Sequence, residues 1–129
     1  MGLFNKLFVG DNQAKEEKFL PWIPLNELPQ LDLIKTKSNS KTQVIFKHST
    51  RCGISRMVMK QFVALYKIAE KDMDLYYLDL LNYLGVSNEI ADKFQVIHES
   101  PQLIVIKNGV VVLHASHGAI NDVDLSRFV

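Results

Sequence analysis

The chain contains one cysteine, Cys52, and the residues near it are mostly basic or hydroxylated. A cysteine thiolate is a nucleophile that attacks the sulfur atoms of disulfides. Arg51 adjoins the cysteine, and no acidic residue occurs between residues 37 and 69. Such an electropositive segment favours the thiolate form. With one cysteine no disulfide can form within a chain, so the thiol acts alone or with a thiol of another molecule.

The thiol is predicted to lie where a strand meets a helix. The apolar run at residues 44–46, extended to residue 48, predicts a strand, and residues 49–50 end it. Apolar residues then recur at three- and four-residue steps over residues 54–69, which predicts a long helix. Because a helix N-terminus carries about half a positive charge, it stabilises a thiolate placed there. The buried face of this helix is expected to carry Ile54, Met57, Val58, Phe62, Leu65, Tyr66 and Ala69.

The rest of the pattern predicts an α/β domain with a mixed sheet. Strands are predicted at residues 22–25, 44–48, 75–78, 103–106 and 110–113. Further helices are predicted after the caps Asn26 and Ser87, and a final helix from Asn121 or Asp122. The first half is βαβ-like, which implies parallel strand pairing. Asn108-Gly109 lies between two β-branched runs and predicts an antiparallel hairpin. This order resembles the thioredoxin-like architecture, a central mixed sheet of about four to five strands flanked by helices.

The dipeptide Ser100-Pro101 precedes the predicted strand at residues 103–106. In thioredoxin-like folds the proline at this place is cis, and the residue before it faces the catalytic sulfur. The resemblance therefore implies that Ser100-Pro101 is cis, lies against Cys52 and pairs with the incoming disulfide substrate. The dipeptide alone would favour a trans bond, since only ~5–6% of X–Pro bonds in folded proteins are cis.

The run Phe46-Lys47-His48-Ser49-Thr50-Arg51-Cys52-Gly53-Ile54-Ser55 resembles the monothiol bacilliredoxins. Their pattern is a strand ending Phe-Lys-His-Ser-Thr, followed by a helix that starts Cys-x-Ile-Ser. The resemblance covers residues 20–129. It departs from the family at Gly53, where relatives often have proline. The residues expected to form the motif or to tune the thiolate are His48, Arg51, Gly53, Ile54 and Ser55.

The resemblance implies a thiol–disulfide oxidoreductase that removes bacillithiol from S-bacillithiolated proteins through Cys52. Bacillithiol is then a co-substrate, and no tightly bound cofactor is expected. Ser55 stands where a dithiol enzyme has its second cysteine, and its hydroxyl can donate a hydrogen bond toward the sulfur. Because serine cannot close a disulfide, a second small thiol or an external disulfide reductase must resolve the adduct.

Three other interpretations use the same residues. Gly53 brings the motif near the Cys-Gly-Phe-Ser of monothiol glutaredoxins, which carry an iron–sulfur cluster with glutathione, although the glutathione-binding pattern is incomplete around Pro101 and Gly118. A cluster carrier of this kind would be coloured on purification. A non-catalytic thioredoxin-like adaptor would tolerate Cys52→Ala without a change in cellular thiol status. A zinc site built from Cys52 and histidines has no recognised ligand spacing, so no metal is expected; the histidines considered are His48, His114 and His117.

Length and composition fit one globular domain in a reducing compartment. The chain has 129 residues, 47% of them hydrophobic and 22% charged, with a formal net charge of +1. This balance gives no reason to expect nucleic acid or an acidic membrane surface as a partner. Asn5 and Lys6 interrupt the apolar N-terminus, so neither a signal peptide nor a membrane span is expected, and the cytoplasm is predicted. Residues 1–18 are predicted to be a polar, flexible segment before a domain at residues 19–129.

Overall fold

The computed structural model describes residues 18–129, so the predicted flexible segment lies outside the described residues except for Lys18. The helices and strands follow one another in an alternating order. They are β1 (Trp22–Pro24), α2 (Pro29–Lys37), β2 (Thr42–His48), α3 (Gly53–Leu65), β3 (Met73–Asp79), α4 (Leu84–Lys93), β4 (Gln102–Lys107), β5 (Val110–Ser116) and the 3₁₀ helices η2 (His117–Asp122) and η3 (Leu125–Phe128). Within this range, no helix is long and apolar enough to cross a membrane.

The strands form one mixed sheet in the order β1-β3-β2-β4-β5. β3 runs parallel to both β1 and β2, whereas β4 runs antiparallel to β2 and to β5. The predicted hairpin is confirmed at Asn108-Gly109, where both residues have positive φ angles. In β2, the central strand, every residue is buried. The predicted mixed sheet, with parallel pairing first and an antiparallel hairpin last, is therefore confirmed.

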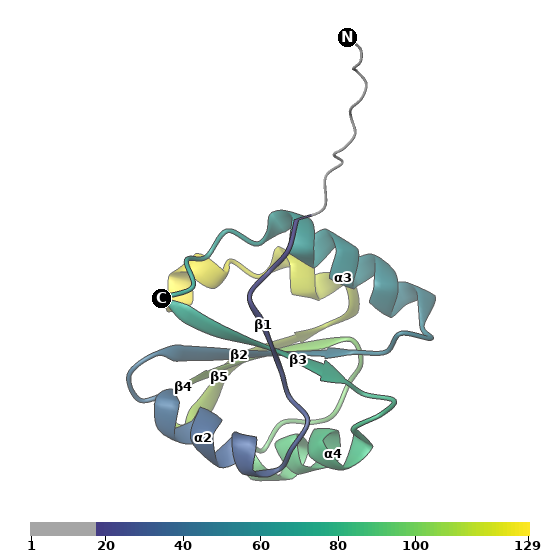
Figure 1. Cartoon of the computed structure of the whole chain (residues 1–129). Helices are drawn as coiled ribbons and strands as arrows, with labels where there is room; N and C mark the ends of the chain where they lie inside the picture. Colours follow the sequence, from purple (N-terminus) through teal and green to yellow (C-terminus); the bar gives the residue numbers. More distant parts are fainter. Residues whose placement is uncertain (1–17) are drawn as a thin grey trace, which may run out of the picture.

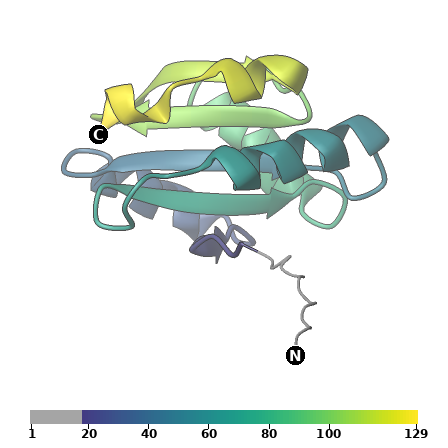
Figure 2. The same cartoon turned by 90° about the horizontal axis from the view of Figure 1, so that it is seen from above.

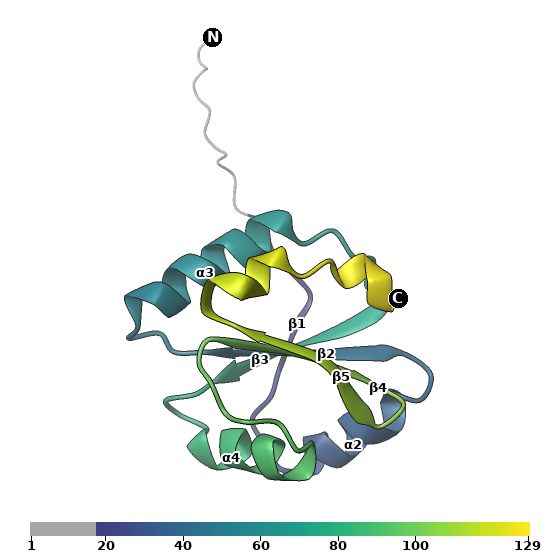
Figure 3. The ribbon, with the colours of Figure 1, turned by 180° about the vertical axis from the view of Figure 1, so that it is seen from behind.

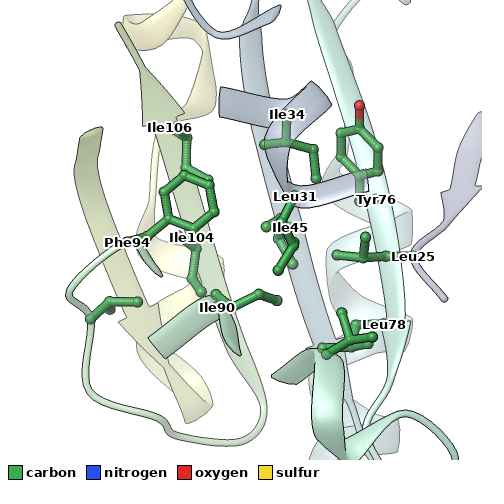
Figure 4. Packing of buried hydrophobic residues seen from close by; sticks show 12 residues of the cluster. Leu25, Leu31, Ile34, Ile45, Tyr76, Leu78, Ile90, Phe94, Ile104 and Ile106 are labelled. Atoms are coloured by element: carbon green, nitrogen blue, oxygen red, sulfur yellow. The ribbon is translucent and has the colours of Figure 1, made fainter. Parts of the chain in front are cut away.

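Helices cover both faces of the sheet. Figures 1 and 3 show α3 and the C-terminal 3₁₀ helices on one face, and α2 and α4 on the other. Seen from above, α3 lies beside the C-terminal 3₁₀ helices (Figure 2). Each face has its own apolar cluster because side chains alternate along a strand: Val44 and Phe46 pack toward α3, whereas Ile45 packs toward α2 and α4 (Figure 4).

The predicted helices differ from the structure at their ends. α2 begins at Pro29 and its N-cap residue is Leu28, so Asn26 does not cap it. α3 ends at Leu65, because Tyr66 adopts an extended backbone with ψ of 127°, so the helix does not reach Ala69. Ile54, Met57 and Leu65 are exposed and do not lie on its buried face. α4 begins at Leu84, and Ser87 is a buried residue within it, not its cap.

The predicted final helix is not an α-helix. The chain instead forms η2 and then η3, separated by an extended backbone at Val123. The Asp124 side chain accepts a hydrogen bond from the Ser126 amide, which caps η3 and starts a separate short turn. The inward packing expected there is retained, since Leu125 is buried and Val123 and Phe128 pack against the α3-side cluster.

Candidate functional site

Cys52 is the N-cap residue of α3, at the predicted junction between β2 and the long helix. Its backbone is extended, with φ of −99° and ψ of 121°. The Cys52 carbonyl accepts the first bond of the helix, from the Arg56 amide at 3.0 Å, and the Cys52 amide donates to the Ser49 carbonyl at 3.2 Å. The side chain is partly exposed and is a free thiol. The Cys52 thiol therefore combines solvent access with the positive end of a helix.

Ser55 is fully buried one turn into α3, and its hydroxyl is bound to the end of β2. The Ser49 amide donates to the Ser55 Oγ at 3.0 Å, and the same oxygen lies 2.8 Å from His48 Nδ1. The hydrogen bond toward the sulfur that the sequence suggested is replaced by these contacts. Since Ser55 accepts from an amide, its single proton is free for the histidine nitrogen. Ser55 thus ties the start of α3 to the end of β2.

His48 is buried beside this contact, and its pKa is below the usual histidine value. Burial is the largest cause, and the charge of Arg56 lowers the pKa further, whereas the charge of Asp79 opposes the shift. A lowered pKa keeps the ring neutral near pH 7, so Nδ1 can accept the proton of Ser55. The predicted tuning residue therefore contacts the helix start through Ser55.

The other motif residues are neighbours of Cys52 in the sequence and are exposed. Arg51 and Arg56 are both exposed, and the Arg56 guanidinium donates to the Thr50 carbonyl at 3.1 Å. Ile54 is 54% exposed and gives the site an apolar surface beside the cations. Gly53 is the first residue of α3, and a Cβ built on it would have only the Arg56 side chain nearby, at 3.9 Å. These side chains offer positive charge and apolar contact to a molecule that approaches Cys52.

The Ser100-Pro101 bond is cis, as predicted. Pro101 immediately precedes β4, which pairs with β2 so that Gln102 is opposite Lys47. The register therefore brings Pro101 to the carboxyl end of β2, the same edge of the sheet from which the chain continues to Cys52. Pro101 is buried and Ser100 is partly exposed. The structure thus brings the strand–helix junction and the cis-proline loop to one edge of the sheet.

A polar network next to this loop was missed from the sequence. Lys47 and Gln102 are both fully buried. The Lys47 ammonium lies 3.1 Å from His98 Nδ1 and 3.4 Å from the Ser87 carbonyl oxygen. The sequence did contain a signal for the burial of Lys47. Lys47 lies two residues after Ile45 in the same predicted strand, so the two side chains point to the same face of the sheet and into the protein.

The histidines do not form a metal site in the part of the chain that the structure describes. Within residues 18–129 there is no group of three or more histidine, cysteine, aspartate or glutamate side chains that could hold a metal ion. His48 is occupied by Ser55. His117 begins η2, where its amide donates to the Pro101 carbonyl at 3.1 Å. The Cys52 thiol is therefore the group at this edge of the sheet that best suits chemistry.

A partly exposed cysteine at a helix start, a cis-proline loop at the same edge of the sheet and a mixed sheet together define a thioredoxin-like protein with a single cysteine. A family model described as monothiol bacilliredoxin BrxC matches residues 23–125. The chain therefore belongs to the monothiol bacilliredoxin family, and its fold and family are those of thiol redox proteins. The predicted family resemblance is confirmed over almost the whole described range.

Solved structures agree with this assignment. A protein with a thioredoxin fold, named for a proposed oxidoreductase activity, is 35% identical, with a TM-score of 0.68 over 82% of this chain and 91% of that chain. Reduced Schistosoma mansoni thioredoxin pre-protein is 24% identical, with a TM-score of 0.61 over 84% of this chain and 98% of that chain. Malassezia sympodialis thioredoxin is 19% identical, with a TM-score of 0.59 over 81% of this chain and 82% of that chain. The last two similarities show the fold alone.

Proposed function

We propose that the protein removes bacillithiol from mixed disulfides with other proteins, through thiol–disulfide exchange at Cys52. The observation that carries this proposal is the partly exposed Cys52 thiol at the start of α3, in a chain with no other cysteine. The family match supports bacillithiol as the co-substrate. The exchange needs a compartment that keeps small thiols reduced, in keeping with the predicted cytoplasmic location.

The first step exchanges one disulfide for another. The Cys52 thiolate attacks the bacillithiol sulfur of the mixed disulfide, and the bond between that sulfur and the substrate cysteine breaks. The substrate cysteine leaves as a thiolate and takes a proton from water. No net oxidation or reduction occurs, because one disulfide bond forms as another is lost. Arg51 and Arg56 supply the positive charge that attracts carboxylate groups of bacillithiol.

The second step needs another thiol, since Ser55 cannot attack the adduct. A second bacillithiol molecule, as thiolate, attacks the bacillithiol sulfur bound to Cys52. The products are the Cys52 thiolate and bacillithiol disulfide, which an external disulfide reductase must reduce. Ser100 and Pro101 are proposed to bind the polypeptide around the substrate disulfide, with the Ser100 backbone pairing as an added strand does.

The test is transfer followed by intact mass. A protein with one bacillithiolated cysteine is mixed with the wild-type chain, with Cys52→Ser, or with buffer. We expect the wild-type chain to gain one bacillithiol as the substrate loses it, and the variant to gain none. A glutathionylated copy of the substrate serves as the matched control for the small thiol. A substrate that keeps its bacillithiol, or that becomes covalently joined to Cys52, would contradict the proposed direction of attack.

A further inference from the structure

Two fully buried polar side chains lie opposite each other near the edge of the sheet that carries the site. Lys47 of β2 pairs with Gln102 of β4, two positions along from the apolar pair Ile45 and Ile104. Both isoleucines belong to the apolar cluster on the α2 and α4 side. Another apolar pair would continue that cluster, so the choice of two polar side chains calls for a reason other than burial of apolar surface.

The polar pair holds three consecutive residues of the loop before the cis proline. The Gln102 carboxamide donates to the Ile97 carbonyl at 2.9 Å and accepts from the Glu99 amide at 3.2 Å. The Lys47 ammonium lies 3.1 Å from Nδ1 of His98, the residue between them. An ammonium group has no acceptor, so this nitrogen accepts and the imidazole is neutral. The next two residues are Ser100 and Pro101.

Burial of the charged Lys47 side chain costs free energy. Burial lowers the pKa of Lys47 to about 8. Within residues 18–129 the hydrogen-bond partners of its ammonium are a carbonyl oxygen and an imidazole nitrogen. Replacement of a buried charged group by an apolar side chain of similar size is often neutral or stabilising. The arrangement therefore suits a role in fixing the loop better than a role in overall stability.

We propose that Lys47 and Gln102 are positioning residues that fix the loop at residues 97–99, and so place the Ser100 backbone for an extended polypeptide that carries the mixed disulfide. The inference rests on the proposed exchange at Cys52. A polypeptide substrate has backbone groups that can pair with Ser100 as an added strand does. A small disulfide lacks such a backbone. The pair therefore distinguishes protein disulfides from small disulfides and leaves the thiol chemistry itself unchanged.

The experiment compares Lys47→Met with Lys71→Met, which removes an exposed lysine just before β3, at the opposite end of the sheet. The first measurement is the rate at which Cys52 reacts with the small aromatic disulfide 5,5′-dithiobis(2-nitrobenzoate). The second is KM and kcat for a bacillithiolated protein. The third is the unfolding midpoint in urea. For Lys47→Met we expect an unchanged small-disulfide rate, an undiminished midpoint and a KM raised by about five- to tenfold, which corresponds to the loss of roughly one hydrogen bond to the substrate. Lys71→Met should match the wild type in all three.

Gln102→Met is the second variant, and amide hydrogen exchange at residues 97–100 is the second observable. We expect faster exchange there in both Lys47→Met and Gln102→Met, with the same rise in KM. An unchanged KM in both variants, or an equal loss of reactivity toward the small disulfide, would overturn the inference. So would failure of both variants to fold, since the pair would then serve the fold itself. Failure of the wild-type chain to act on the protein substrate would instead refute the proposed function.

Discussion

At the scale of the residue, the single hydroxyl of Ser55 makes two contacts. It accepts a hydrogen bond from the amide of partly buried Ser49 and contacts Nδ1 of buried His48. Ser55→Ala leaves the Ser49 amide and the His48 ring nitrogen without this partner, which typically costs about 1–3 kcal/mol. We expect the free energy of unfolding in urea to fall by this amount. The exposed Ser40→Ala is the control and should change it little; an equal effect in both variants would contradict the role of Ser55.

The position of Ser55 also predicts what a second thiol would do there. Cys52 is the N-cap of α3 and Ser55 is three residues on, a spacing at which the two residues of a capping box reach each other. We expect bacillithiolated Ser55→Cys to release bacillithiol and to form an internal disulfide without added reductant. Intact mass and peptide mapping measure both events. Ser40→Cys should keep the adduct as long as the wild type; if Ser55→Cys does the same, position 55 does not give access to the sulfur.

At the scale of the element, the backbone at the start of α3 is compatible with a proline at position 53, where this chain has glycine. Cys52 has the extended backbone that a residue before proline requires. Gly53 is the first helical residue, where the missing amide proton of proline costs little. We expect Gly53→Pro to fold normally and to raise the free energy of unfolding by about 0.4–1 kcal/mol, because the unfolded chain loses freedom. Urea unfolding measures this, with Gly53→Ala for comparison. A destabilised Gly53→Pro would mean that the helix start needs the freedom of glycine.

At the scale of the whole molecule, Lys47 links stability to pH. Its pKa is about 8 in the folded chain and near 10.5 when unfolded. Between these values the unfolded chain binds more protons, so stability rises with pH. The penalty is full below pH 8, at about 3 kcal/mol, and is gone above 10.5. We expect Lys47→Met to remove this rise, so that its advantage over the wild type shrinks from pH 7 to pH 10. Parallel stability curves in urea would contradict the lowered pKa.

The fold was largely readable from the sequence because its signals are local. Strand runs such as residues 44–48, the Asn108-Gly109 hairpin and the strand–helix junction at Cys52 are all confirmed in the structure. The helix ends were predicted less well, because the apolar spacing continues to Ala69 although the backbone turns extended at Tyr66. Periodicity also placed Ile54 and Met57 on the buried face, although both side chains are exposed.

The place of Cys52 at the strand–helix junction was predictable from local patterns, and the cis bond at Pro101 was predictable from the resemblance to thioredoxin-like folds but not from the dipeptide itself. The contacts among the side chains that hold the site in place were not predicted. The bond between Ser55 and His48, and the reach of Lys47 to His98 across 51 positions of sequence, depend on packing between separate elements. Single-residue signals do not encode such pairings, since they arise only when β2, α3 and the loop between α4 and β4 are assembled.

The presence of one cysteine also determines how an adduct at Cys52 would depend on the small-thiol pool. When a lone thiol exchanges with a small disulfide, one small thiol is released, so the adducted fraction at equilibrium depends on the simple ratio of small disulfide to small thiol. A dithiol that closes an internal disulfide releases two, and its balance therefore shifts whenever the total pool is diluted or concentrated. The occupancy of Cys52 is thus a measure of the ratio alone, and it stays constant when a cell swells, shrinks or changes the size of its thiol pool at a fixed ratio.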